Sequence, residues 1–179
     1  MQRKIIWKNG NCLICILLIT AILFCNQLSA SAQTWSITPE EKAMIDFHLG
    51  GAKMFAREGR YNEAEALYKE ILKVEPTNTD AHYGLGKTYL FEKKYNEAKI
   101  CYIQTGKLGI KEELLPAYFF NLSLIDIGLR NNKEAISDLR QCLSFKPDYK
   151  SAKELLILIE VAYKRDGNNS MITIDRPRP

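Results

Sequence analysis

The sequence predicts an all-α protein, an α-solenoid of about three helix-turn-helix units closed by a C-terminal capping helix. The first reason is an internal repeat. Tyr-Asn-Glu-Ala occurs at 61–64 and again at 95–98, a spacing of 34 residues, and a weaker copy at 131–147 follows after 37. A fixed period of about 20–50 residues is typical of stacked repeat units. The second reason is helical periodicity, because apolar residues of the first copy recur on one helix face: Ala64, Leu67, Tyr68, Ile71 and Leu72.

A strong helix start opens the repeat region. Thr38 is a good N-cap, Pro39 suits the first turn, and Glu41 completes a capping box. Gly50 and Gly51 lie inside this first helix, where each costs about 1 kcal/mol relative to alanine, so we expect close packing against them. Helices are expected over 39–57 and 61–74, 79–91 and 95–107, 116–129 and 133–145, and finally 149–165.

These helices define the domain organisation. The repeat domain covers 39–165, with units at about 45–78, 79–112 and 116–149 and the capping helix at 149–165. Repeat stacks usually end in such a helix, which covers the last core face and turns a polar side outward. The connection 108–115 is three residues longer than the repeat frame requires. Residues 33–38 form a short linker, and 166–179, which end Arg-Pro-Arg-Pro, are expected to be a disordered tail.

The first 32 residues have the pattern of a secretory signal peptide. Arg3, Lys4 and Lys8 precede an apolar run of 14 residues, Cys12–Cys25, and Ala30-Ser31-Ala32 offers a cleavage site after Ala32. The run is shorter than the ~20 residues needed to span a bilayer. An uncleaved anchor is the second interpretation and lipidation at Cys25 the third, although Phe24 is bulky for a lipidation site. The protein is therefore expected to be exported, to the periplasm or cell envelope first and as a secreted protein second.

Charge and cysteine content narrow the function. Three of the 25 basic residues and no acidic residue precede residue 33, so the remainder carries 22 basic and 21 acidic groups. A near-neutral chain gives no electrostatic basis for nucleic-acid binding. Only Cys101 and Cys142 remain beyond the signal, too few for a disulfide framework. They are interpreted as isolated small thiols, with pairing between them left open.

The repeat columns resemble those of the tetratricopeptide repeat (TPR) family, whose unit is a pair of antiparallel helices. Leu85-Gly86, then Tyr89, Ala98 and Tyr102, fit its pattern of leucine-glycine, aromatic, alanine and aromatic. Its proline column holds Pro76 and Pro147, but Ile110 in the middle copy. The resemblance covers roughly 45–165, most of the chain beyond the signal.

One short motif partly matches the consensus of a nucleotide-binding loop. Gly86-Lys87-Thr88 match the last three letters of a phosphate-binding loop, but Ala81 stands where its first glycine belongs. Such a loop follows a buried strand, whereas 75–80 reads as a helix end and the cap of the next helix. Gly86 instead shares its repeat column with Ala52 and Ser123, small residues that let two helices approach. We expect it to serve packing.

Candidate chemical sites are few. His48 and His82 occupy one repeat column, which the family fills with a large aromatic, and they lack a neighbouring carboxylate or thiolate for a metal site. We interpret them as core histidines and expect no metal, no cofactor and no catalytic set. Glu112 and Glu113 are assigned to a helix start. Asp126 is the misfit, because it occupies an aromatic column. Either Arg130 reaches it, or the third pair is rotated to expose it, and rotation is the preferred interpretation.

The resemblance also implies where a ligand would bind. In the family, ligands lie along the first helix of each pair, and the matching columns here begin with Asp46 and Leu49. Leu49 and Lys53 occupy the columns of the family's lysine-asparagine clamp for chaperone tails, so that clamp is absent. The predicted partner-binding groove is lined by Lys53, Arg57, Tyr83, Lys87, Leu90, Phe91, Phe120, Leu124 and Ile127.

An apolar groove with a basic end suits a peptide or amphipathic helix that carries acidic residues. The sequence thus predicts an exported, non-catalytic interaction module that binds a protein or peptide partner, in a cell-envelope assembly. Contact with a membrane would come only through an uncleaved signal or a lipid anchor. The alternative is a self-associating structural scaffold, a homo-oligomer whose groove is filled by another copy.

Overall fold

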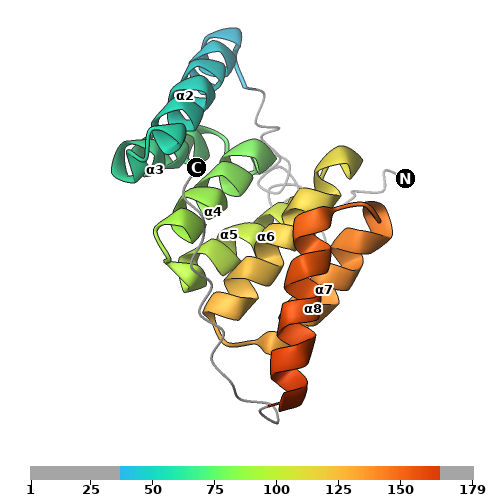
Figure 1. Ribbon diagram of the computed structural model, residues 1–179. Helices are drawn as coiled ribbons and strands as arrows, with labels where there is room; N and C mark the ends of the chain where they lie inside the picture. The colour runs from blue at the N-terminus through green and yellow to red at the C-terminus, as the bar shows by residue number, and fades with distance from the viewer. Residues whose placement is uncertain (1–36, 166–179) are drawn as a thin grey trace, which may run out of the picture. The chain divides into compact units, whose positions relative to one another are not determined.

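A computed structural model describes residues 37–165, and within this range every regular element is helical (Figure 1). The signal peptide expected at 1–32, including Cys25, most of the linker and the tail expected at 166–179 lie outside the described residues. The helices belong to one compact unit that begins at Thr38. In chain order they are α2 (Pro39–Arg57), α3 (Tyr61–Val74), α4 (Thr79–Phe91), α5 (Tyr95–Leu108), the 3-10 helix η1 (Glu112–Leu114), α6 (Leu115–Gly128), α7 (Asn132–Phe145) and α8 (Lys150–Arg165).

Consecutive helices pack against one another. α2 pairs with α3, α4 with α5 and α6 with α7, and the pairs join through the α3–α4, α5–α6 and α7–α8 contacts. The first helices also touch, α2 against α4 and α4 against α6. Figure 1 shows the helices in chain order, from blue at α2 through green at α4 to red at α8. The predicted all-α solenoid of three helix pairs and a final helix is confirmed.

The predicted helix bounds differ from the observed ones by at most one residue. At the first of them, Thr38 Oγ1 accepts the backbone N–H of Glu41 at 3.2 Å and Glu41 accepts that of Thr38 at 2.9 Å, so the capping box is present. The long connection between α5 and α6 folds into η1, whose residues Glu112 and Glu113 precede α6 as expected. Because η1 leads directly into a helical turn, α6 begins at Leu115 rather than Pro116.

The same turn joins the two helices of every pair. Gly59, Lys93 and Arg130 have positive φ angles of 77°, 61° and 64°. In each turn the following residue donates its N–H back across the helix end, as Lys94 does to the Tyr89 carbonyl at 2.9 Å. This is the Schellman arrangement, which favours glycine at the left-handed position. Only the first copy has a glycine there.

Small residues allow the paired helices to approach. A Cβ on Gly86 would lie 2.7 Å from the Tyr102 ring, and the equivalent Ala52 and Ser123 are buried. The packing role predicted for Gly86 is confirmed, and Thr88 lies buried within the helix with its hydroxyl donating to the Gly84 carbonyl at 3.0 Å. The two glycines of α2 differ from each other. A Cβ on Gly51 would meet Leu67 at 3.1 Å, whereas one on Gly50 would meet nothing within 4 Å, so the prediction of close packing is wrong for Gly50.

The preferred interpretation of Asp126 is also wrong. Its side chain is fully buried and lies 2.5 Å from the ammonium of Lys99 on α5. Asn131 donates a further hydrogen bond to it at 3.2 Å. A buried carboxylate needs such partners, and a lysine of the preceding pair supplies the charge. The third helix pair therefore keeps the regular orientation instead of rotating to expose this residue.

The two cysteines of the repeat domain are free and buried, and burial raises the pKa of both Cys101 and Cys142 to about 11. They are isolated small thiols, as the sequence indicates. No helix in residues 37–165 is both long enough and apolar enough to cross a membrane.

Candidate binding face

The predicted groove residues lie on α2, α4 and α6, the first helices of the three pairs. α4 is the centre of this set, because it contacts both α2 and α6. Tyr83 on α4 is half-buried, with its ring 5.5 Å from that of Tyr102 and its hydroxyl accepting a hydrogen bond from Asn121 of α6 at 3.4 Å. Burial raises the pKa of Tyr83, so the hydroxyl stays neutral at physiological pH. Tyr83 thereby connects the second and third pairs.

The end of α4 carries an exposed aromatic and cationic group. The ring of Phe91, 41% exposed, stacks on Tyr61 at a centroid distance of 5.9 Å. The ammonium of Lys87, one turn earlier on the helix, lies 6.0 Å from the Phe91 centroid, within the range of a cation–π contact. Because Tyr61 begins α3, this arrangement lies where the first pair meets the second.

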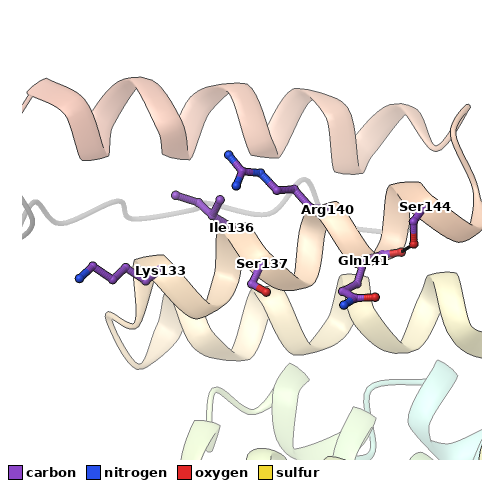
Figure 2. Close-up of a pocket in the computed structure, with 6 residues that line it drawn as sticks. All are labelled: Lys133, Ile136, Ser137, Arg140, Gln141 and Ser144. Carbon is purple, nitrogen blue, oxygen red and sulfur yellow. Dashed lines mark hydrogen bonds between the residues drawn. The ribbon is translucent and has the colours of Figure 1, made fainter.

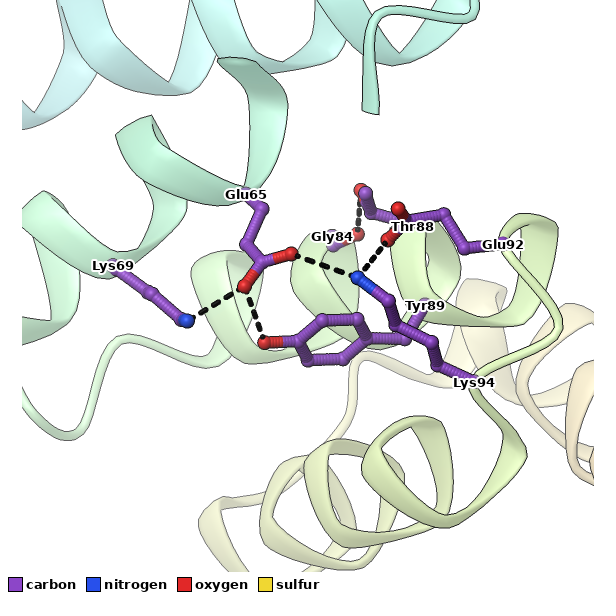
Figure 3. A network of polar contacts seen from close by, with 7 residues as sticks. All are labelled: Glu65, Lys69, Gly84, Thr88, Tyr89, Glu92 and Lys94. Atoms are coloured by element: carbon purple, nitrogen blue, oxygen red, sulfur yellow. Dashed lines mark hydrogen bonds and ion pairs between the residues drawn. The ribbon is translucent and has the colours of Figure 1, made fainter. Parts of the chain in front are cut away.

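A polar network fixes α4 against α3 (Figure 3). The carboxylate of Glu65 accepts hydrogen bonds from Lys69 at 2.6 Å and from the Tyr89 hydroxyl at 3.0 Å, and it pairs with Lys94 at 3.4 Å. Burial alone would raise the pKa of Glu65, but the hydrogen bonds from Lys69 and Tyr89 outweigh it and lower the pKa. The carboxylate therefore stays ionised, and the network holds the first two pairs in register.

The predicted groove residues do not all reach the surface. Lys53, Arg57 and Lys87 are exposed, as is Phe91. Leu90 and Ile127 are 6% and 7% exposed and belong to the core. Because both side chains are buried, the structure removes them from any contact surface.

Phe120 and Leu124, the predicted groove residues of the third pair, are half-buried because other parts of the chain pack against them. Both pack against the hydrophobic cluster formed by α6, α7 and α8. The ring of Phe120 meets Tyr149 edge-on at 5.1 Å. The chain thus covers the third-unit part of the groove itself, and the accessible part is the surface of α2 and α4. We call this surface the α2–α4 face and define it by Lys53, Arg57, Tyr83, Lys87 and Phe91.

Sequence reasoning missed three residues that shape this region. Tyr61, Asn121 and Tyr149 support Phe91, Tyr83 and Phe120 respectively. Tyr61 could have been found, because it starts the repeated Tyr-Asn-Glu-Ala segment. Asn121 and Tyr149 lie in columns that the family pattern leaves unspecified, and only the packing of neighbouring pairs reveals their contacts.

A hollow of about 340 Å³ lies elsewhere, along one side of α7 (Figure 2). Arg140 in its wall is bound to Glu160 of α8 at 2.7 Å, so its charge ties the last two helices together. The other lining residues are Lys133, Ile136, Ser137, Gln141 and Ser144. Surface polar groups of this kind do not converge on one point, and the hollow offers no arrangement for chemistry.

The histidines have structural surroundings. His82 Nε2 lies 2.9 Å from the Pro76 carbonyl, a hydrogen bond within the inter-pair turn, and the ring of His48 lies 6.0 Å from that of Phe47. Within residues 37–165 no group of three or more metal-ligating side chains comes together. Both histidines are half-buried, so neither lies in the buried core where the sequence interpretation placed them.

Comparison with protein families identifies the repeat. A tetratricopeptide repeat model matches residues 55–108, and a second tetratricopeptide repeat model matches 116–149. The chain contains TPR repeats. The two matches run from the last turn of α2 to the residue before α8, with a gap at 109–115, and they lie in the region where the residue columns of the sequence repeat. The comparison with curated proteins gave no match.

Solved TPR structures share this fold at low sequence identity. The first TPR of Spaghetti (RPAP3), bound to the HSP90 peptide SRMEEVD, is 18% identical with a TM-score of 0.62, covering 68% of this chain and 94% of that one. YrrB, described as a TPR protein with an unusual peptide-binding site, is 17% identical with a TM-score of 0.59, covering 79% and 66%. An O-GlcNAc transferase mutant from Thermobaculum terrenum is 23% identical with a TM-score of 0.61 over 69% of this chain. The match spans only 23% of the transferase.

Proposed function

We propose that the protein is a non-catalytic interaction module whose α2–α4 face binds a peptide or helix of a partner protein. The observation that carries the proposal is the exposed group at the end of α4, where the Phe91 ring is supported by Tyr61 and accompanied by the Lys87 ammonium. An exposed aromatic ring that is held in place can bury apolar surface on binding at little cost in conformational entropy. One similar TPR structure was solved with a bound peptide and another is described as having a peptide-binding site, and both support the same use of the fold.

The charges of the face define the partner. Lys53, Arg57 and Lys87 give it an excess of positive charge on adjacent first helices. A ligand with an apolar side chain for Phe91 and with acidic residues beside it matches both features. The ligand is therefore expected to be an acidic segment with an aromatic or large aliphatic anchor.

We further propose that the protein works outside the cytoplasm, in the periplasm or cell envelope. The support is the sequence pattern of residues 1–32 alone. N-terminal sequencing of the protein from its own cells tests it, because export with processing predicts a chain that starts at Gln33.

A random peptide library displayed on phage tests the binding face. Peptides selected by the full chain should be rich in Asp and Glu around an apolar anchor. A variant carrying Lys53→Glu, Arg57→Glu and Lys87→Glu should select peptides rich in Lys and Arg instead. Selection of the same peptides by both proteins would rule out the α2–α4 face.

Phe91→Glu should weaken binding of the selected peptides at least about tenfold, the loss expected when one anchor worth about 1.4 kcal/mol is removed. Ile100→Glu on α5 is the matched control, because it changes another exposed apolar residue, 68% exposed. Phe120 is unsuitable for this test, since its contact with Tyr149 makes Phe120→Glu a stability variant.

The alternative is a scaffold whose groove is filled by a second copy. It predicts that Phe91→Glu abolishes self-association of the full chain rather than peptide binding. Sedimentation of that variant distinguishes the two functions.

A further inference from the structure

α8 has an apolar side that no other helix in residues 37–165 covers. Ile157, Leu158 and Val161 are 64%, 53% and 60% exposed and lie within four residues of one another. Spacings of one, three and four residues place them on one side of the helix. The opposite side packs on α7 through Ala152, Leu155 and Ile159, all of them buried.

The repeat columns explain why this side is open. The Gly86 column of α4 faces the second helix of its own pair, because a Cβ there would meet Tyr102 and Cys101 of α5, and Ile157 occupies this column in α8. Leu90 and Ile127 are buried one turn later on their helices, and Val161 is their equivalent. α8 thus has the position of a first helix, and the second helix of its pair is missing from the described residues. The surface that such a helix would cover is therefore exposed.

The occupant is not a regular fourth-pair helix. In the column where paired helices approach closely, the earlier first helices have Ala52, Gly86 and Ser123, whereas α8 has Ile157. A large side chain there keeps a neighbouring helix at a greater distance than in the other pairs. The following residues, 166–179, contain Gly167, Pro177 and Pro179 and have no helical period.

The charges on α8 favour a second copy of the same helix. Glu154 is 66% exposed, lies 3.8 Å from the ammonium of Lys150 on the same helix and precedes the apolar residues, while Lys164 lies after them in the last turn. In an antiparallel pair centred on residue 159, Ile157 of one copy lies opposite Val161 of the other. The same register places Glu154 opposite Lys164. The two-fold axis of the dimer repeats this pair, so one Glu154–Lys164 ion pair lies at each end of the apolar contact. In a parallel pair, Glu154 would lie opposite Glu154 and Lys164 opposite Lys164, and both contacts would be repulsive.

We propose that α8 is a self-association surface through which two copies of the chain pair antiparallel, with Ile157, Leu158 and Val161 in the contact and Glu154 opposite Lys164 of the second copy. A contact limited to one helix from each chain falls below the roughly 1,200 Å² that stable interfaces bury, so the dimer is weak and concentration-dependent. This surface shares no residue with the α2–α4 face, so the dimer contact does not use that face.

Charge reversal in the full chain tests the proposal by sedimentation velocity over a wide range of concentration, with all variants in the same buffer. The unchanged chain should dimerise reversibly. Glu154→Lys and Lys164→Glu should each weaken the dimer by about tenfold, because two attractions become two repulsions across the axis. The chain that combines both changes should recover the dimer. Ile100→Glu is the matched surface control and should behave as the unchanged chain does.

Val161→Glu should abolish the dimer while leaving the circular dichroism spectrum unchanged. A chain that stays monomeric at all concentrations would overturn the proposal, and this is the result expected if residues 166–179 fold back over α8. So would association that persists through the single charge reversals, which would place the contact on another part of the chain. Failure here leaves the peptide-binding proposal intact, because that test uses variants of α2 and α4.

Discussion

The ammonium of Lys99 on α5 lies 2.5 Å from the fully buried carboxylate of Asp126 on α6. Lys99→Met should lower the free energy of unfolding by about 2–4 kcal/mol, because it leaves a buried carboxylate without its counter-charge. Urea denaturation followed by circular dichroism measures the loss. Asp126→Asn should cost less, and the double variant should lose less than the sum of the two single changes. Additive losses would show that the pair is not coupled.

Asp138 makes stability depend on pH in an unusual direction. Burial, followed by the nearby charge of Asp126, raises the pKa of Asp138 from 3.8 to about 7, while Lys99 opposes the shift and Glu134 adds to it. The folded protein therefore holds this proton more tightly than the unfolded chain does. The stability contributed by the protonated carboxyl is fully present below about pH 4 and is lost as pH rises through 7.

Asp138→Asn isolates this contribution, because an amide does not titrate. The variant should be more stable than the unchanged chain at pH 8 and should gain little or nothing at pH 4, where Asp138 is protonated. Thermal unfolding of both proteins across this range gives the difference curve. A difference that does not change with pH would contradict the shifted pKa.

The glycines of the first helices should respond to alanine in opposite directions. Gly86→Ala places a Cβ 2.7 Å from the Tyr102 ring and should destabilise the protein by about 1–3 kcal/mol. Gly50→Ala meets nothing within 4 Å and should stabilise it by about 0.5–1 kcal/mol, the helix-propensity difference. Unfolding midpoints of the two variants provide the comparison. Loss of stability in Gly50→Ala would mean that something outside residues 37–165 packs against that helix face.

The turns between paired helices give a fourth prediction. Lys93→Gly should raise stability by about 0.5–1 kcal/mol, because it removes a side chain from a φ of 61°. Gly59→Ala, at the equivalent position with φ 77°, should lower stability by a similar amount. Calorimetric melting temperatures measure both. If both substitutions changed the melting temperature in the same direction, the backbone would not keep its left-handed conformation after substitution.

The fold could be predicted almost completely because its signals are local. The helix periodicity and the capping box at Thr38 depend on residues within a few positions of one another, and the spacing of 34 residues is read directly from the sequence. For the same reason the exposed cations Lys53, Arg57 and Lys87 were placed correctly on the surface. Leu90 and Ile127 were assigned to the groove from their place on a first helix, whereas both side chains are buried in the core.

Asp126 shows where local reasoning ends. The sequence identifies a carboxylate in an aromatic column. Its partner Lys99 lies 27 residues earlier, on α5 of the preceding helix pair. Pairing at that separation depends on how one helix pair rotates against the next. The covering of Phe120 by Tyr149 depends on a different contact, between α6 and the residue that precedes α8.

By itself, the sequence determined that the chain forms stacked helix pairs, where each helix starts and stops, and which small residues lie between them. These features are set by backbone hydrogen bonding and by apolar spacing along one helix. The tertiary structure decided that Lys99 neutralises Asp126, that α7 and α8 cover Phe120 and Leu124, and that α8 keeps an apolar side exposed. Those outcomes depend on side chains that meet across helix pairs, and their contacts exist only once the stack has formed.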